Sequence, residues 1–352
     1  MATMRRANTG VVSQVVTKDT LLFDWAKFQP RAASLCVPAI ALSLAVGIGA
    51  GHPRQGVMAA AGAFSVGFGS FQELRRSRRA PMLLAAAVMC VSSWIGALAG
   101  LSNTGAVLAC TLWGYLYGTV WTLSPGVAWI ALQGVVWLVI STAYPVHGVG
   151  ALTRGSFVLA GGLLQMLFVL GFWRTSGSVT PAFGGAGHDS ESETLAGALE
   201  NSREQRVQAI RAAVILAIAS ALDRWLALPN GYWIPMTAAI VMKGTLRQTF
   251  QRGLARIVGT LAGAALATLI AAHLRPDPWI LAALVVLFAG LCYLMIYVNY
   301  ATFAICLTSY VVFLLALAGL PEGALIAHRS MNTILGGAIA LSVHAAFAPL
   351  ER

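Results

Sequence analysis

The sequence predicts an all-α integral membrane protein with about twelve transmembrane helices in two parallel six-helix repeats. Its composition, the spacing of its apolar segments and the recurrence of its basic residues lead to this fold class. Hydrophobic residues make up 58% of the 352 residues and charged residues only 10%, whereas a soluble domain carries about 25% charged residues. Together with a mean hydropathy of +0.76, this composition indicates a chain that folds in lipid.

The first segment, 1–30, is polar and is expected to form a cytoplasmic tail. Its stretch 21–28 mixes aromatic and charged residues, which is typical of an interfacial helix on the inner leaflet, although the same composition also suits a disordered tail. The tail contains no apolar core of a cleavable signal peptide. Membrane insertion is therefore expected to begin with the first span.

Twelve apolar segments follow, each close to the roughly 20 residues that a spanning helix needs. The first six form the predicted first transmembrane repeat, 31–173, and the last six form the second, 207–352. The stretch 174–206 between them is rich in Gly, Ser and Glu and is expected to be a cytoplasmic linker. The predicted spans are 32–50, 55–71, 80–100, 105–123, 126–144, 149–173, 207–228, 231–246, 253–273, 278–298, 300–319 and 324–348.

Basic residues predict the orientation of these spans. Of the 23 Lys and Arg residues, all but five fall in the tail, the linker, the C-terminus and the loops on one side; the five are Arg54, Arg154, Arg224, Arg275 and Arg329. The positive-inside rule then places both termini and the linker in the cytoplasm. The chain is expected in the inner membrane of a bacterial cell, with anionic lipid at its cytoplasmic face. A net charge of +11 could also indicate nucleic-acid binding, but basic residues beside apolar spans favour the membrane interpretation.

The two halves of the chain share an internal repeat. Shifts of 175–177 residues superpose three pairs of basic residues: Arg75 on Arg252, Arg79 on Arg256, and Arg154 on Arg329. Because basic residues are scarce here, these matches weigh more than matched Ala or Leu. Units with an even number of helices share one orientation, so the axis that relates them is expected along the membrane normal.

Arginine within the predicted spans points to an anion as the ligand. Arg154 and Arg329 lie about five residues into the sixth and twelfth spans, where a guanidinium is costly unless it snorkels, pairs or faces water. A guanidinium binds a carboxylate through two parallel hydrogen bonds, so both could face one pathway for a small organic anion. The alternative is that each snorkels to the interface. Acidic residues, the usual cation and proton sites, are nearly absent from the spans.

Lys243 ends the eighth predicted span, and with Arg252 and Arg256 it could form a basic cytoplasmic entrance. The alternative for Lys243 is an anchor at the inner leaflet. Pro235, in the same span, either loosens a helix that lines a cavity or sits in the first turn, where proline is tolerated.

Motifs for chemistry or cofactors are not found in the sequence. The five cysteines lie in apolar runs without CxxC spacing, and neither HxxxH nor HExxH occurs, so no metal site is expected. Without a Walker A motif, no nucleotide is expected as a cofactor. No nucleophile or acid–base pair stands within the spans, so an enzyme is not expected.

One stretch of the second half resembles a known family. Residues 231–238 read Gly-Tyr-Trp-Ile-Pro-Met-Thr-Ala, followed by Lys243, Arg252 and Arg-Ile-Val-Gly-Thr over 256–260. This pattern resembles the fusaric acid resistance-like family, which includes bacterial aromatic acid exporters and is distantly similar to plant aluminium-activated malate transporters. The resemblance covers the second half well and the first half mainly through the repeat. It implies export of organic, often aromatic, carboxylates, or an anion channel.

The leading interpretation is an exporter of organic anions with its path between the halves. The candidate substrate-binding residues are Arg154, Arg329, Lys243, Arg252, Arg256, Trp233 and Thr237; those at 233, 252 and 256 could instead fix the fold of the helix hairpin. A passive anion channel shares every feature, and a membrane scaffold without transport is the less favoured alternative. The sequence leaves a homo-oligomer open.

Overall fold

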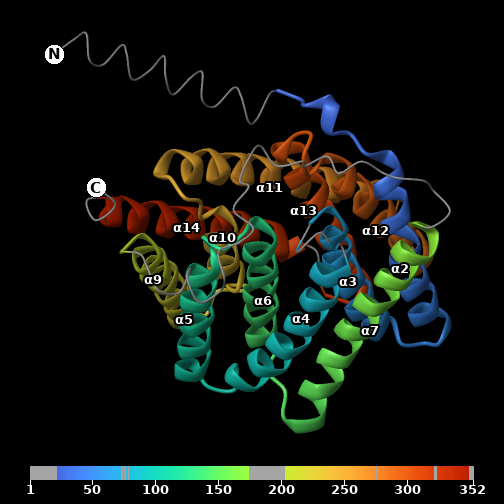
Figure 1. Cartoon of the computed structure of the whole chain (residues 1–352). Helices are drawn as coiled ribbons and strands as arrows, with labels where there is room; N and C mark the ends of the chain where they lie inside the picture. Colours follow the sequence, from blue (N-terminus) through green and yellow to red (C-terminus); the bar gives the residue numbers. More distant parts are fainter. Residues whose placement is uncertain are drawn as a thin grey trace.

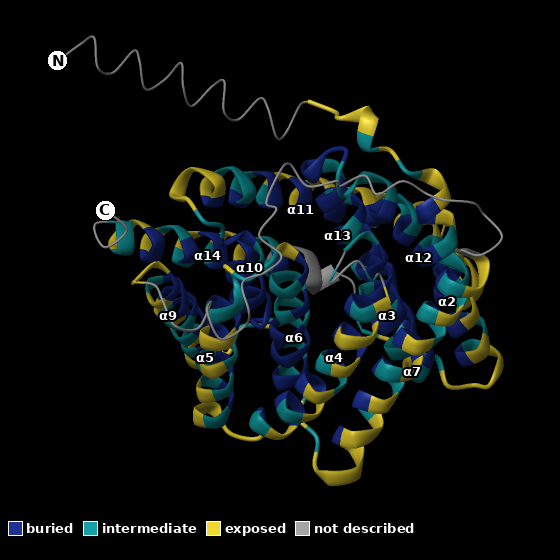
Figure 2. Ribbon diagram, viewed as in Figure 1, coloured by how far each residue is buried: buried dark blue, intermediate teal, exposed yellow. Residues whose placement is uncertain are grey.

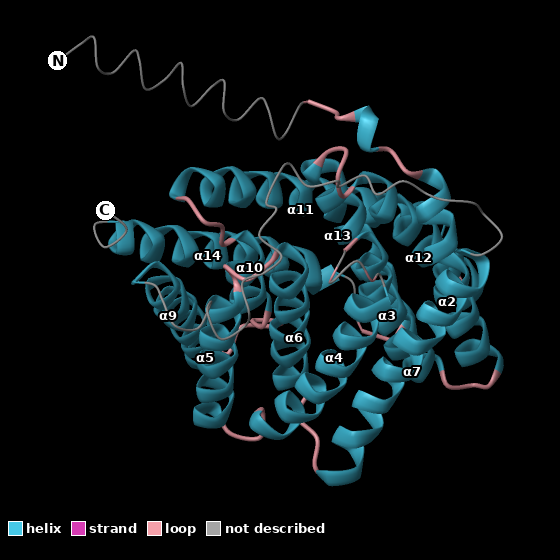
Figure 3. Ribbon diagram, viewed as in Figure 1, coloured by secondary structure: helices cyan, strands magenta, loops and turns pink. Residues whose placement is uncertain are grey.

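The computed structural model describes residues 22–72, 74, 77, 79–173, 203–274, 276–320 and 323–348. Over these residues the chain forms twelve α-helices, two short 3-10 turns and one isolated bridge. Figures 1 and 3 show the arrangement of the helices and of the loops that connect them. The predicted all-α membrane fold class is confirmed. Most of the polar tail, residues 174–202 of the predicted linker 174–206 and three arginines of the first basic loop (Arg75, Arg76 and Arg78) lie outside the described residues. The last residues of the predicted linker already belong to the helix that begins at Arg203.

The helices follow the order of the predicted spans. The first half contains α2 (Pro30–Gly49), α3 (Pro53–Gly67), α4 (Arg79–Ala99), α5 (Asn103–Val120), α6 (Pro125–Ala143) and α7 (Gly148–Trp173). The second half contains α9 (Arg203–Leu226), α10 (Trp233–Val241), α11 (Leu246–Leu274), α12 (Pro278–Met295), α13 (Tyr300–Leu317) and α14 (Gly323–Phe347). Proline at the first turn starts α2, α3, α6 and α12, since its missing N–H would have no partner there.

Eight of the described helices are long and apolar enough to cross a membrane on their own: α2, α4, α6, α7, α11, α12, α13 and α14 from residue 328. The most marked departure from the sequence prediction is the eighth span, predicted over 231–246. There α10 covers only 9 residues, and the chain turns to an extended conformation at Met242. A helix of that length is about 14 Å long, less than half of the roughly 30 Å hydrocarbon core.

The two halves pack their helices in the same way. In the first half α3 packs on α2 and α7, and α4 packs on α6 and α7; in the second, α10 packs on α9 and α14, and α11 packs on α13 and α14. Between the halves, α5 packs on α9 and α12 packs on α2. When α2–α7 are matched in order with α9–α14, the α5–α9 contact corresponds to the α12–α2 contact. The division of the chain into two repeats stays a prediction.

Small residues bring α5 and α9 close together. A Cβ atom at Gly118 would lie 2.5 Å from the Cα of Ala209, and one at Gly114 would lie 2.8 Å from the carbonyl oxygen of Ala212. Since higher numbers on one helix meet lower numbers on the other, the two helices run antiparallel. Close backbone approach at small residues is a common means of helix association in membranes.

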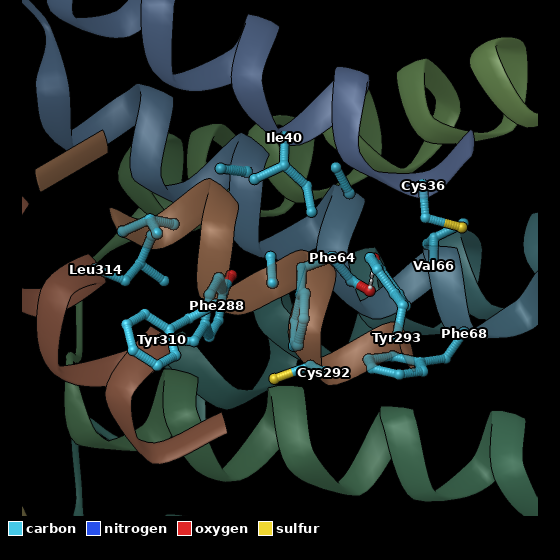
Figure 4. Packing of buried hydrophobic residues seen from close by; sticks show 14 of the residues in the cluster. Cys36, Ile40, Phe64, Val66, Phe68, Phe288, Cys292, Tyr293, Tyr310 and Leu314 are labelled. Carbon is cyan, nitrogen blue, oxygen red and sulfur yellow. Dashed lines mark hydrogen bonds between the residues drawn. The ribbon is translucent and has the colours of Figure 1, made fainter. Parts of the chain in front are cut away.

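An aromatic cluster joins α3 of the first half to α12 and α13 of the second (Figure 4). Phe64 stacks on Tyr310 with ring centroids 4.1 Å apart, and Phe68 lies 4.6 Å from Tyr293. The hydroxyl of Tyr293 donates a hydrogen bond of 2.7 Å to the carbonyl of Phe64. Exposed residues gather on the outward faces of the helices (Figure 2), where large apolar side chains such as Leu108 and Leu167 are suited to contact lipid.

Candidate functional site

Two buried arginines from neighbouring helices lie at the centre of the candidate site. Arg256 of α11 is 2% exposed and Arg329 of α14 is 1% exposed. Among the described residues, no hydrogen-bond partner is found for Nε and Nη1 of Arg256 or for any guanidinium nitrogen of Arg329. The two charges are close enough to repel each other. Burying an unpaired charge costs several kcal/mol, so this pair is suited to receive an anion.

Trp233 and Thr237 of α10 line the same helix interface. The guanidinium carbon of Arg329 lies 3.9 Å from the ring centroid of Trp233, a cation–π distance. Gly336 lets α14 approach closely, since a Cβ there would lie 2.4 Å from the carbonyl oxygen of Ile234 and 2.9 Å from the Cβ of Thr237. The indole N–H of Trp233 and the hydroxyl of Thr237 have no hydrogen-bond partner among the described residues. We call Arg256, Arg329, Trp233 and Thr237 the arginine cluster.

Asn332, one turn beyond Arg329 on α14, positions the start of α10. Its side-chain amide donates hydrogen bonds of 3.2 Å and 3.0 Å to the carbonyls of Pro229 and Asn230 in the α9–α10 loop. The Oδ1 atom of Asn332 has no partner in the described structure. The loop that leads into Trp233 is therefore tied directly to the helix that carries Arg329.

Lys243 and Arg252 lie nearer the end of the bundle from which the linker leaves, here called the linker face. The Lys243 ammonium lies 5.5 Å from the ring centroid of Trp121, and the Arg252 guanidinium lies 3.4 Å from that of Tyr300. Burial, together with the nearby charge of Arg252, lowers the pKa of Lys243 to about 7. Arg256 follows Arg252 by one helical turn and lies deeper. The predicted basic entrance thus holds Lys243 and Arg252, and Arg256 belongs with Arg329.

Arg154 lies in a different environment. It is half-buried, and its Nη1 donates to the carbonyls of Ser141 and Tyr144 at the end of α6. Cations are favoured at helix C-termini because they complement the carbonyls there. The ring of Tyr144 lies 5.9 Å from that of Tyr232, which precedes the tryptophan under Arg329. Arg154 therefore reaches the arginine cluster only through two tyrosine rings, and its predicted pairing with Arg329 stays a prediction.

Sequence reasoning did not assign a site role to Arg211 and His344. Arg211 of α9 is fully buried; its Nη1 lies 2.9 Å from Nε2 of His344, and its Nη2 donates to the carbonyl of Lys243 at 3.0 Å. Only the recurrence of Arg-Ala-Ala at Arg31 and Arg211 singled out this arginine in the sequence. Its burial depends on helix packing, which the sequence pattern does not show.

The arginine cluster is enclosed by protein. A surface cavity of about 280 Å³ lies elsewhere, between α5 and α9, and is lined by Asn103, Thr104, Val107, Leu108, Ala221, Arg224 and Trp225. Among the described residues, no group of three or more His, Cys, Asp or Glu side chains could hold a metal ion. An anion would thus reach the arginine cluster only after helices move.

This fold and site define a helical membrane protein with buried arginines, only partly hydrogen-bonded within the described chain, at the interface of its short helix α10. Residues 215–343 match the family described as fusaric acid resistance protein-like, a segment that contains the whole arginine cluster. The predicted resemblance is therefore confirmed for the second half of the chain. The distant similarity to plant malate transporters stays a prediction.

Comparison with individual proteins gives a shorter match. The chain is 31% identical over 84 residues to a Salmonella typhimurium protein named uncharacterized transporter YdhK. The aligned part covers 24% of this chain and 12% of that protein. No solved structure matches the chain.

Proposed function

We propose that this protein is an inner-membrane transporter that exports organic anions, in particular aromatic carboxylates, with its termini and linker in the cytoplasm. The observation that carries the proposal is the pair of buried guanidinium groups of Arg256 and Arg329, in which Nε and Nη1 of Arg256 and all three nitrogens of Arg329 have no hydrogen-bond partner among the described residues. A carboxylate would supply the missing counter-charge and accept hydrogen bonds from the fork of an arginine. The match to the fusaric acid resistance protein-like family and the likeness to an uncharacterized transporter support the transporter class.

The arginine cluster also suits an aromatic substrate. Trp233 presents a large ring beside Arg329, so an aromatic acid can stack on the indole while its carboxylate binds the guanidinium. The free hydroxyl of Thr237 can donate a further hydrogen bond to the carboxylate. We assign substrate binding to these residues and to Arg256, and we place Arg154 outside this set because its guanidinium is bound to backbone carbonyls.

Lys243 and Arg252 would form the entrance on the linker face. Arg252 and Arg256 are spaced by four residues, which places them on one side of α11. An anion attracted by the partly exposed Lys243 and Arg252 could pass to Arg256 and then to Arg329. The closed environment of the cluster favours an alternating-access carrier, and a passive anion channel is the alternative.

Uptake of radiolabelled benzoate into proteoliposomes tests the proposal. Arg329→Gln and Arg256→Gln should each lower the initial rate at least about tenfold, since a hydrogen bond to a charged group contributes about 1.5–3 kcal/mol. Arg247→Gln is the matched control, because Arg247 lies exposed on the same helix as Arg256. Unchanged initial rates in both Arg329→Gln and Arg256→Gln would show that these arginines do not bind the transported anion. Large single-channel currents carried by benzoate would show that the protein is a channel and not a carrier.

A further inference from the structure

A second buried polar group lies between the arginine cluster and the linker face, outside the proposed substrate-binding residues. Arg211 and Gln208 come from α9, Thr249 comes from α11 and His344 comes from α14; all four are at most 5% exposed. Nη1 of Arg211 lies 2.9 Å from Nε2 of His344, and Oγ1 of Thr249 lies 3.2 Å from Nδ1 of the same ring. Nη2 of Arg211 also donates to Oε1 of Gln208. We call these four residues the histidine latch.

The contacts of the latch assign the protons on His344. A guanidinium nitrogen can only donate, so Nε2 of His344 accepts from Arg211 and carries no hydrogen. The neutral ring then carries its hydrogen on Nδ1 and donates it to Oγ1 of Thr249, whose own hydrogen goes to the carbonyl of Thr245 at 3.1 Å. If Nε2 of His344 gained a proton, two hydrogen-bond donors would face each other, one on the positively charged imidazolium and one on the guanidinium of Arg211. Protonation of His344 and its contact with Arg211 therefore exclude each other.

The same groups hold the connection between α10 and α11. The backbone N–H of Lys243 donates to Oγ1 of Thr249 at 3.0 Å, and the carbonyl of Lys243 accepts from Arg211 at 3.0 Å. Both backbone groups of this entrance residue are thus bound by the latch. If Arg211 leaves its present position, the connection loses one of these two bonds.

Of the three helices that pack on α14, α9 and α11 bring polar or charged groups to His344, and α10 (Trp233–Val241) contains no charged or titratable residue. Arg211 faces the ring from α9. From α11, Thr249 contacts it, and Arg252 lies one turn further along, near Lys243 of the α10–α11 connection. The charged groups described near the His344 ring are thus basic. Their positive charge opposes the protonation of His344 until Arg211 and its neighbours move away.

We propose that His344 is a proton-binding site of the transport cycle, and that its protonation releases Arg211 and opens the α10–α11 connection to anions. This inference rests on the proposed function, because it couples a proton to the anion path. Histidine changes its charge near neutral pH, and intramembrane titratable residues are frequent proton relays in transporters. The latch would thus link the proton gradient to movement at the basic entrance.

Two substitutions at His344 separate the neutral from the charged state. Gln can accept from Arg211 through Oε1 but cannot be protonated, whereas Arg keeps its charge over this pH range. Benzoate transport by the wild-type protein should rise at least about fivefold from pH 8 to pH 5.5 and should move protons, measured with a pH-sensitive dye inside the liposomes. The rates are compared at saturating benzoate, so that a pH dependence of KM at Lys243 does not affect them. His344→Gln should abolish this rise and the proton movement, and His344→Arg should transport at a rate independent of pH.

The matched control is His273→Gln, because His273 is an exposed histidine at the opposite end of α11; this variant should keep the wild-type pH profile. A merely structural role of His344 would lower the rate at every pH and leave the profile unchanged. A wild-type pH profile, or undiminished proton movement, in His344→Gln would overturn the inference. Benzoate transport by the wild-type protein that is independent of pH would overturn it as well, while the proposed function would stand.

A second measurement does not depend on transport. Met242, which precedes Lys243, is 2% exposed, so a cysteine at this position reacts with a water-soluble maleimide only when the connection opens. Labelling of Met242→Cys should accelerate severalfold from pH 8 to pH 5.5, after correction for the pH dependence of a free thiol. The added substitution His344→Gln should remove this acceleration. Equal acceleration with and without His344 would show that the latch does not bind the proton, whatever the substrate.

Discussion

The guanidinium carbon of Arg329 lies 3.9 Å from the ring centroid of Trp233. This contact joins α14 to the first turn of α10, the shortest α-helix of the described chain. Trp233 begins the 9-residue α10 and lies inside the bundle, whereas tryptophan in membrane proteins is usually enriched at the interfaces. The ring is 4% exposed. Trp233 thus stabilises a buried charge that has no other described partner.

Trp233 should accordingly be replaceable by Phe but not by Leu. Phe retains an aromatic face for Arg329, whereas Leu removes the cation–π contribution, which is about 2 kcal/mol for desolvated pairs. We expect Trp233→Leu to lower the free energy of unfolding by at least about that amount and to raise the KM for benzoate, with Trp233→Phe close to wild type. Thermal unfolding in detergent and transport kinetics measure the two effects. Equal behaviour of Leu and Phe would contradict a role for the ring.

Arg154 should affect stability more than transport. Its bonds to the carbonyls of Ser141 and Tyr144 fix the end of α6, and their loss leaves acceptors unsatisfied at a cost of about 1–3 kcal/mol. Arg154→Gln should therefore lower the unfolding temperature while the transport rate per folded molecule stays within about twofold of wild type. Quantitation of folded protein by size-exclusion chromatography provides the normalisation. A fall in the transport rate per folded molecule without a fall in the unfolding temperature would show that Arg154 acts in the anion path.

The sequence predicted the helices well because apolar length is a local property. It also predicted Arg256, Trp233 and Arg329 as candidates, since basic and aromatic residues stand out against an apolar background. It could not separate Arg329 from Arg154, which occupy equivalent positions in the repeat. Their difference arises from neighbours distant in sequence: Trp233 lies beside one, and the carbonyls of α6 bind the other.

The short α10 and the histidine latch could not be predicted either. The apolar run 231–246 has the length of a span, and its early end depends on how Arg211 and Thr249 bind the backbone of Lys243. Those residues are 32 and 6 positions away. Which side chains meet there is determined by tertiary packing and not by local pattern.

Lys243 should make substrate affinity depend on pH above neutrality. Its pKa is lowered from 10.5 to about 7 by burial and by Arg252, so the side chain loses its charge as the pH rises from 7 to 9. The KM for benzoate should rise over this range, and Lys243→Arg should remove the rise because arginine stays charged. Lys243→Met should show a high KM at every pH. A KM that rises equally in all three proteins would exclude Lys243 as the cause.

The same shift predicts how stability depends on pH. Between pH 7 and 10.5 the unfolded chain holds a proton on Lys243 that the folded chain has released. Stability rises with pH wherever the unfolded state binds more protons, so this residue contributes an increase in stability across that window. Lys243→Met should flatten this part of the profile of unfolding temperature against pH. Lys27→Met is the control, since Lys27 is partly exposed and paired with Asp24 at 2.9 Å.

The contact between α5 and α9 should be the interface between the halves that tolerates added volume least. A side chain at Gly118 would meet the backbone of Ala209 at 2.5 Å and the carbonyl of Gln208 at 2.6 Å, so the helices must separate to admit it. On α12, which packs against α2 in the equivalent contact, a Cβ at Gly290 meets only a methyl group of Val37, at an ordinary van der Waals distance of 3.4 Å. Overpacking typically costs about 1–3 kcal/mol.

We therefore expect Gly118→Val to lower the unfolding temperature strongly and Gly290→Ala to change it little. Gly171→Val is the second control, since nothing lies within 4 Å of a Cβ at that position and the substitution tests helix propensity alone. If the two halves rock against each other during transport, Gly118→Val should also reduce the benzoate transport rate of the molecules that remain folded. Equal unfolding temperatures for Gly118→Val and Gly171→Val would show that α5 and α9 are not held in close contact.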